Sequence, residues 1–261
     1  DYDDAVFVWY ENNRLLSGKL PNLIRAAREV IVGNQDLLRF ASRHNPKVSV
    51  VPTVIDTARY APREDYGGRD ARGIVVGWVG APVTVRYLTT MSGALQTLAR
   101  KHRIVVRCVG GPGDFAIPGV TVENVPWRQD TEVETIRSFD IGVMPLADEP
   151  FAYGKCGLKL IQYMGCGVPS VGANLGANAE IIRNGVDGFL ASGDGEYVEM
   201  MERLIGDQRL RERIGRAGRN TVEERYSLRV RAREFCGVLE RAARGGEFQA
   251  RRQRVAAQAA D

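Results

Sequence analysis

The chain has 261 residues, of which 44% are hydrophobic, and this length suits one large domain or one domain and part of another. Its net charge of +4 is compatible with anionic small molecules or a membrane surface, but it is too small to indicate nucleic-acid binding. No apolar run approaches the ~20 residues of a membrane span. The four cysteines lack paired metal-site spacing, so we expect reduced thiols in a cytoplasmic protein.

The first region predicts an incomplete α/β domain over residues 1–54. The chain begins DYDDAVFVWY, with no signal peptide and no initiator Met, from which we expect that an upstream segment has been removed. Between residues 30 and 53 the sequence alternates as strand, helix and strand (VIVGN, QDLLRFASRH, VSVVPT), the pattern of a parallel βαβ unit. Residues 55–73 are polar and interrupted by Pro62, Gly67 and Gly68, so we predict a linker there.

A longer α/β series follows over residues 74–227. The predicted strands are 74–79, 104–109, 120–125, 141–144, 170–172 and 188–191, and the predicted helices are 84–102, 130–138, one opening near Gly157, and 179–184. In the last of these, Glu180 is placed to cap the helix start. Such alternation predicts a parallel sheet with helices on both faces, and its ligands bind beyond the carboxyl ends of the strands. Glycines gather at those predicted ends, at Gly77, Gly80, Gly110, Gly111 and Gly154.

The C-terminal region is predicted to be helical. Helices are expected over 196–205, over 208–224 and from 228 to about 244, and the tail from Gly245 is either frayed helix or disorder. We assign residues 228–261 to a C-terminal helix and basic tail. Its arginines are compatible with peripheral membrane contact on the cytoplasmic face and equally with a solvated helix face.

The segment from Phe151 to Leu190 carries the clearest functional signal. A loop of Gly154, Lys155, Cys156 and Gly157 precedes a predicted helix, and unpaired N–H groups at a helix start favour a diphosphate. Lys155 and Lys159 are four residues apart, so we expect them to share a helix face and to add positive charge. The sequence therefore predicts a phosphate site.

Several segments resemble, in the same order, the nucleotide-sugar-binding half of the GT-B glycosyltransferases of the retaining group 1 family. They are GWVGAP (77–82), VPW (125–127), FDIGVMPLAD (139–148), GKCGLKLIQYMGCGVPSVGA (154–173) and NGVDGFLA (184–191). The resemblance covers roughly residues 74 to 230. It implies a GT-B-type Rossmann-like donor domain, preceded by the end of the family's acceptor-side N-terminal domain.

The resemblance also implies roles for individual residues. The glycine turn from Gly77 to Gly80 would approach the donor's diphosphate, and Arg86 on the next helix would neutralise phosphate charge. The loop and helix start containing Gly154, Lys155, Gly157 and Lys159 would hold the donor's phosphates and sugar. The base would lie near Val125 and Trp127 and be read by backbone groups.

This sequence departs from the family at two positions. Family members commonly carry two glutamates eight residues apart, the second of which grips the ribose, and the aligned residues here are Gly154 and Gln162. The Gln162 amide can still hydrogen-bond a ribose, without charge assistance, whereas Gly154 cannot replace a carboxylate. Lys155 and Lys159 would compensate by gripping the phosphates.

Structural roles are the alternative for each of these residues. Gly77 and Gly80 could permit close helix–strand packing, Trp127 could be a packing residue, and Arg86 and the lysines could be solvated. Cys156 and Cys166 are interpreted as packing residues, and no general base is identifiable. Asp1, Asp3 and Asp4 suggest the metal-binding Asp-x-Asp of the unrelated GT-A fold; in GT-B-like surroundings we expect no metal and no cofactor, and an acceptor-side role is the alternative.

The expected activity is sugar transfer, with retention, from a nucleotide-diphosphate sugar to a glycan or lipid-linked acceptor in surface-polysaccharide biosynthesis. One alternative is a donor-binding module, or a fragment that needs a missing first domain or a partner chain. Another is a nucleotide-sugar epimerase. A dinucleotide-dependent oxidoreductase is disfavoured because no G-x-G-x-x-G follows the first strand of either region.

Overall fold

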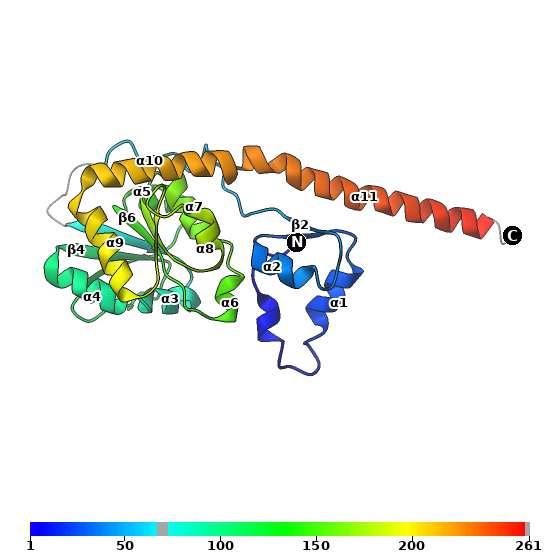
Figure 1. Ribbon diagram of the computed structural model, residues 1–261, viewed down its shortest axis with the longest axis horizontal. Coiled ribbons are helices and arrows are strands. Elements are labelled where there is room, and N and C mark those ends of the chain that lie inside the picture. Colours follow the sequence, from blue (N-terminus) through cyan, green and yellow to red (C-terminus); the bar gives the residue numbers. More distant parts are fainter. Residues whose placement is uncertain (67–72, 259–261) are drawn as a thin grey trace.

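The fold is given by a computed structural model that describes residues 1–66 and 73–258, with side chains described as far as residue 244. It has a small N-terminal α/β unit, which we call the first unit, and a larger α/β domain, which we call the second domain (Figure 1). A long C-terminal helix, α11 (Leu228–Gln258), runs from the second domain back across the first unit.

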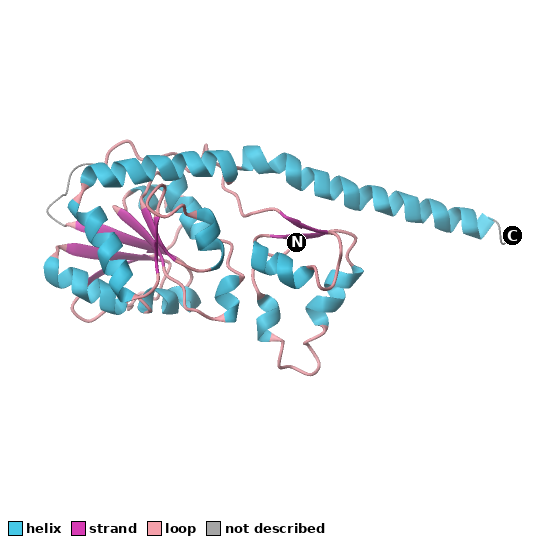
Figure 2. Ribbon diagram, in the orientation of Figure 1, coloured by secondary structure: helices cyan, strands magenta, loops and turns pink. Residues whose placement is uncertain are grey.

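The second domain is built on a parallel sheet with the strand order β5-β4-β3-β6-β7-β8 among the described residues (Figure 2). Its strands are β3 (Ile74–Val79), β4 (Ile104–Val109), β5 (Thr121–Val125), β6 (Ile141–Met144), β7 (Ser170–Ala173) and β8 (Phe189–Ala191). β3, β4 and β6 have the predicted limits, and the other three differ from prediction by one residue. All five strand pairs are parallel, as the alternating sequence pattern predicts.

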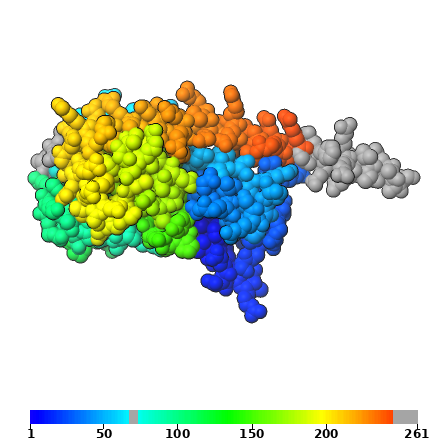
Figure 3. Space-filling view, viewed as in Figure 1, coloured from blue at the N-terminus to red at the C-terminus, as the bar shows by residue number. Residues whose placement is uncertain are grey.

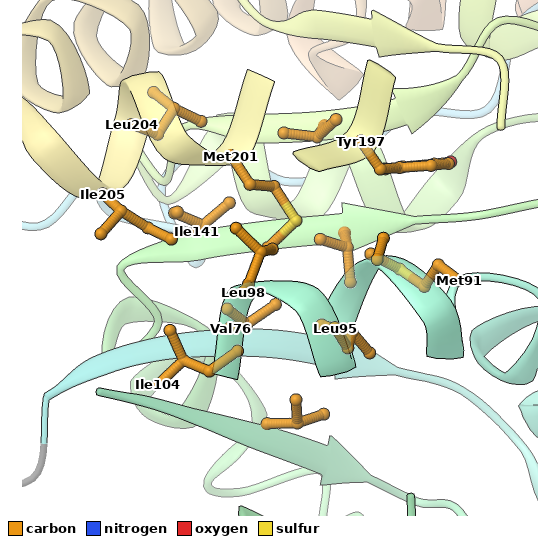
Figure 4. Close-up of a cluster of buried hydrophobic side chains, with 14 of the residues drawn as sticks. Val76, Met91, Leu95, Leu98, Ile104, Ile141, Tyr197, Met201, Leu204 and Ile205 are labelled. Atoms are coloured by element: carbon orange, nitrogen blue, oxygen red, sulfur yellow. The ribbon is translucent and has the colours of Figure 1, made fainter. Parts of the chain in front are cut away.

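Helices cover both faces of this sheet. They are α3 (Val85–Thr89), α4 (Ser92–Lys101), α5 (Glu132–Arg137), α6 (Pro150–Tyr153), α7 (Leu158–Gly165), α8 (Gly176–Ile181), α9 (Asp194–Gly206) and α10 (Gln208–Arg225), with a short 3₁₀ turn η2 (Pro82–Thr84) before α3. One apolar cluster joins the sheet to α4 and α9 through residues such as Val76, Leu98 and Met201 (Figure 4). A second cluster joins the opposite face to α5, α7, α8 and α10.

The helix predicted over residues 84–102 is in fact two helices, α3 and α4. The break lies between Thr89 and Ser92, where the Thr90 hydroxyl donates to the Tyr87 carbonyl and the Ser92 hydroxyl donates to the Thr89 carbonyl. Such side-chain bonds to nearby carbonyls compete with helix continuation.

The helix predicted over residues 179–184 was also placed wrongly. It is α8, which begins at Gly176 and ends at Ile181, because the backbone N–H of Arg183 donates to the Asp187 carboxylate and turns the chain. Glu180 therefore lies near the end of α8 and does not cap its start. Burial raises the pKa of this carboxyl.

The first unit contains η1 (Val6–Trp9), α1 (Lys19–Ala26), β1 (Val30–Val32), α2 (Gln35–Ala41) and β2 (Val48–Val50). Strands β1 and β2 pair in parallel, and Tyr2 forms a further parallel bridge to Val32. Its apolar cluster includes Phe151 and Cys156 of the second domain. The space-filling view shows the blue first unit packed directly against the green residues near position 150 (Figure 3).

Residues 55–66 of the predicted linker are packed against the second domain. Ile55 bridges to Ser227, and Tyr60 and Tyr66 are buried. The Arg219 guanidinium donates to the carbonyls of Thr57, Tyr60 and Gly165, which ties this segment to the end of α7. The remaining linker positions, 67–72, lie outside the described residues.

The tail after Gly245, predicted as frayed helix or disorder, continues α11 as far as Gln258. Arg241 contacts the first unit through Ser49 and Glu29. None of the helices in the described part of the chain has the length and apolarity needed to cross a bilayer.

Gly77 gives a test of the second domain's packing. A Cβ atom at this position in β3 would lie 2.0 Å from the Phe139 ring, so Gly77→Ala is expected to lower the free energy of unfolding by about 1–3 kcal/mol. Gly113→Ala is the matched control, since nothing lies within 4 Å of the added methyl group there. Urea denaturation measures both variants, and equal effects would contradict the close packing at Gly77.

Candidate nucleotide-sugar site

A cavity of about 400 Å³ opens at the carboxyl ends of β3, β4 and β5. We call it the sheet-edge cavity, and the residues that matter below are Gly80, Gly110, Trp127, Glu132, Lys159 and Gln162. It lies beside the point where the strand order reverses, since β4 and β5 follow β3 on one side and β6, β7 and β8 lie on the other. Open α/β sheets bind ligands at this position.

Helix α7 is held against the sheet by Tyr163. This side chain is fully buried, and its hydroxyl accepts a hydrogen bond of 2.9 Å from the backbone N–H of Val79 at the end of β3. Gly142 on β6 leaves room for the ring, because a Cβ there would lie 2.6 Å from it. The start of α7 is thereby fixed relative to the carboxyl end of β3.

The start of α7 faces the sheet-edge cavity without a side-chain cap. Its N-cap residue is Gly157, whose φ of +70° is a conformation that favours glycine, and Leu158 and Lys159 line the cavity. The first N–H groups of a helix have no partner within it, so they are available to a ligand. Together with the helix dipole, they favour an anion.

Lys159 adds positive charge at the same place. Its ammonium lies 5.8 Å from the centre of the Trp78 ring, and burial, followed by the charge of Lys155, lowers its pKa to about 8. A desolvated ammonium beside a like charge is stabilised when an anion binds between them. This end of the cavity is therefore suited to phosphate.

The other end of the sheet-edge cavity holds a buried polar network around Glu132. Its Oε1 accepts from Trp127 Nε1 at 2.9 Å and from Gln162 Nε2 at 3.2 Å, while Oε2 accepts from the Tyr60 hydroxyl at 2.6 Å. Burial and the Glu132 hydrogen bond raise the pKa of Tyr60 to about 12, so its hydroxyl remains a donor. Trp127 is 49% exposed, which leaves much of its surface open to a ligand.

Lys155 lies outside α7, so the prediction that it shares a helix face with Lys159 was wrong. The helix begins only at Leu158, and Lys155 belongs to the loop before it. Its ammonium forms a 2.9 Å ion pair with Asp4 of the first unit and lies 4.5 Å from the centre of the Phe151 ring. Lys155 and Lys159 nonetheless line one small cavity together.

Asn34 holds the loop between α6 and α7 from the first unit. This buried side chain accepts from Leu37 N–H, which caps α2, and its amide group donates to the carbonyls of Tyr153 and Lys155 at 3.0 and 3.1 Å. The Cys156 thiol donates to the Asp3 carbonyl at 3.1 Å. Burial raises the pKa of this thiol to about 12, in keeping with a packing role.

Gly154 packs against the backbone of the first unit. A Cβ atom at this position would lie 2.4 Å from both the Cβ and the backbone N of Ala5. No side chain fits at position 154 unless Ala5 moves. The position of Ala5 therefore leaves no room for a carboxylate at position 154.

Six of the predicted site residues lie outside the lining of the sheet-edge cavity. Gly154, Lys155 and Gly157 belong to the loop before α7 described above, and the other three are Gly77, Arg86 and Val125. Gly77 is inside β3 and packs against Phe139, so the turn begins only after Val79. The Arg86 guanidinium forms a bidentate ion pair with the Glu149 carboxylate, with N–O distances of 2.6 and 3.0 Å. Val125 ends β5, where its carbonyl accepts from Gly110 N–H.

Sequence reasoning missed Glu132, Asn34 and the pairing of Asp4 with Lys155. Glu132 has the ordinary appearance of an acidic residue in the first turn of a helix. The other two act across the contact between the two units, and a single sequence carries no signal for that contact.

A second cavity, of about 420 Å³, lies between the first unit and α11. It is lined largely by apolar residues, such as Ile31, Val51 and Phe235, together with the acidic Asp1 and Asp3. Arg231 also lines it, but its guanidinium is paired with Glu234. The arrangement does not favour a phosphate, so we regard the sheet-edge cavity as the candidate site.

Comparison with known proteins agrees with this geometry. The model of the family "Glycosyl transferases group 1" matches residues 73–207, just over half of the chain. A D-inositol 3-phosphate glycosyltransferase of Streptomyces bingchenggensis is 28% identical over 56% of this chain and 34% of its own length. A second protein of that name, from Catenulispora acidiphila, is 25% identical over 76% of this chain and 52% of its own length. The chain thus spans about a third to a half of these relatives.

Among solved structures, the Anabaena protein HepE in complex with UDP and glucose has a TM-score of 0.71 at 19% identity, covering 88% of this chain and 68% of that protein. At this identity the likeness shows the fold, which is of the GT-B type. The residues matched by the family model, 73–207, include the sheet-edge cavity and the loop from Gly154 to Gly157. The chain therefore belongs to the group 1 family of glycosyl transferases.

Proposed function

We propose that the sheet-edge cavity binds the nucleotide of a nucleotide-diphosphate sugar and that the protein transfers this sugar to a glycan or lipid-linked acceptor. One observation carries the proposal. The sheet-edge cavity is lined by the uncapped start of α7, by the desolvated Lys159, and by the polar side chains Glu132 and Gln162 beside the exposed Trp127. The diphosphate would lie against Gly80, the start of α7 and Lys159. The nucleoside would extend toward Trp127.

The ribose would be received by the Gln162 amide and the Glu132 carboxylate together. Gln162 occupies the position where the family commonly has a glutamate, and Glu132 places a carboxylate 3.2 Å from its amide nitrogen. A carboxylate is the strongest acceptor for sugar hydroxyls among protein groups. Glu132 would therefore supply, from α5, the charge that position 162 lacks.

Transfer would depend on charge stabilisation. The bond between the anomeric carbon and the diphosphate oxygen breaks, the nucleoside diphosphate takes the electron pair, and an acceptor hydroxyl bonds to the carbon as it loses its proton. Negative charge develops on the leaving diphosphate, where the N–H groups of α7, Lys159 and Lys155 are already oriented. We propose that the anomeric configuration is retained, in keeping with the family resemblance.

The first test of the donor site is calorimetric titration of the protein with UDP, GDP and ADP. Lys159→Ala and Lys155→Ala should each weaken binding by about 1–3 kcal/mol, since each removes a charge-assisted contact to phosphate. Lys101→Ala is the matched control, because this lysine pairs with Glu202 on the surface. Absence of binding to all three nucleotides would contradict the donor site, whereas binding without transfer or hydrolysis of a nucleotide sugar would favour a binding module over an enzyme.

The pKa of Lys159 predicts the pH dependence of nucleotide binding. In the free protein this pKa is lowered to about 8, so the side chain is a charged ammonium below pH 8. Above pH 8 it is a neutral amine, which must take up a proton when the nucleotide binds. Affinity should therefore fall as the pH rises from about 7 to about 9.5, a range above the second phosphate pKa near 6. In Lys159→Gln the affinity should be lower and nearly constant over this range. A fall of the same size in the variant would assign the pH dependence to another group.

Ribose recognition is tested by comparing UDP with 2′-deoxy-UDP. The protein should bind UDP more tightly, and Gln162→Met and Glu132→Gln should each reduce this preference by about 1 kcal/mol, as expected for one hydrogen bond. Gln208→Met, at an exposed position, should leave it unchanged. If both site variants bind the two nucleotides with an unchanged ratio, the ribose does not lie at Glu132 and Gln162.

A further inference from the structure

The functional groups of the site follow one another in a single series that crosses from the second domain to the first unit. The aromatic and amide groups of Trp127 and Gln162 share the sheet-edge cavity with Lys159. Lys159 shares the next small cavity with Lys155, and Lys155 is paired with Asp4. The series thus runs from nucleoside-binding groups through two cations to a carboxylate.

This order matches that of a nucleotide-diphosphate sugar, in which the sugar follows the two phosphates. A carboxylate at the far end of the cations would repel a phosphate. It suits a neutral sugar, whose hydroxyls donate hydrogen bonds, and it stabilises the positive charge that develops at the anomeric carbon as the diphosphate leaves.

Asp4 is placed to play this part. Its Oδ1 lies 2.9 Å from Lys155 Nζ, and its side chain is 39% exposed, so it remains open to a ligand. In the described residues no hydrogen bond reaches its Oδ2. The next residue, Ala5, fills the space that a side chain at position 154 would need. The segment with Asp4 and Ala5 thus excludes a carboxylate from position 154 and supplies the Asp4 carboxylate nearby.

We propose that Asp4 is the sugar-binding carboxylate of the donor site and that it acts across the contact between the first unit and the second domain. This inference rests on the proposed function. Asp4 accepts hydrogen bonds from the hydroxyls of the donor sugar while one of its oxygens remains paired with Lys155. The first unit thereby completes the donor site as well as flanking it.

The test separates sugar binding from diphosphate binding in the full chain. The dissociation constant is measured by calorimetry for the nucleoside diphosphate that binds among UDP, GDP and ADP, and for its conjugates with glucose, galactose, mannose and N-acetylglucosamine. Asp4→Asn should bind the nucleoside diphosphate as tightly as the unmodified protein or more tightly, because a negative charge near the phosphates is gone. The extra affinity of the preferred sugar conjugate over the diphosphate should fall about tenfold.

Two further variants make the result specific. Lys155→Ala should weaken binding of the diphosphate and of its sugar conjugate by the same factor. Asp36→Asn, which changes a partly exposed carboxylate of α2 that is paired with Arg39, should alter neither. If Asp4→Asn also weakens both ligands equally, Asp4 only positions Lys155, and the proposal is wrong.

The remaining outcomes are equally decisive. If the nucleoside diphosphate binds but none of its sugar conjugates binds more tightly, the proposed sugar site is wrong and the nucleotide site stands. Absence of nucleotide binding would overturn the proposed function itself. The unfolding temperature of Asp4→Asn, expected to match that of the unmodified protein within a few degrees, separates these effects from loss of fold.

Discussion

The double hydrogen bond from Asn34 to the loop before α7 is the constraint on which the candidate site depends. Its amide group donates to the carbonyls of Tyr153 and Lys155, and its oxygen caps α2. Because Asn34 is buried with all three bonds made, the loop has little freedom to move away from the first unit. The ion pair of Lys155 with Asp4 and the close approach of Ala5 to Gly154 follow from this placement. The loop before α7, where we propose that the phosphates bind, is thus shaped by both units.

The electrostatics of the site follow from the same arrangement. Lys155 has a partner in Asp4, whereas Lys159 is desolvated beside it, with its pKa lowered to about 8. The free site therefore holds a cation whose charge is poorly compensated, next to helix N–H groups that lack a cap. A bound diphosphate would compensate the charge of Lys159 and accept hydrogen bonds from the free N–H groups. The cavity beside α11 is less suited to an anion, because Asp1 and Asp3 line it.

Much of the second domain follows from its sequence, since its strands are continuous apolar segments and turn residues separate them. Ile74–Val79, Ile104–Val109 and Ile141–Met144 have the predicted limits for this reason. The helix break at Thr90 and the early start of α8 depend on side-chain bonds and turns that periodicity does not register. Of the site, the glycine loop and its lysines could be predicted from chain order. Glu132, Asn34 and Asp4 could not, because their roles come from neighbours 30 or more residues away in sequence.

We propose that a nucleotide-diphosphate sugar lies across the sheet-edge cavity with its diphosphate at the start of α7. The most direct measurement is a crystal structure of the protein soaked with UDP. We expect phosphate oxygens within hydrogen-bond distance of the Leu158 and Lys159 backbone N–H groups and of Lys159 Nζ, with the ribose beside Gln162 and Glu132. A nucleotide in the cavity between the first unit and α11, with the start of α7 facing solvent, would contradict it.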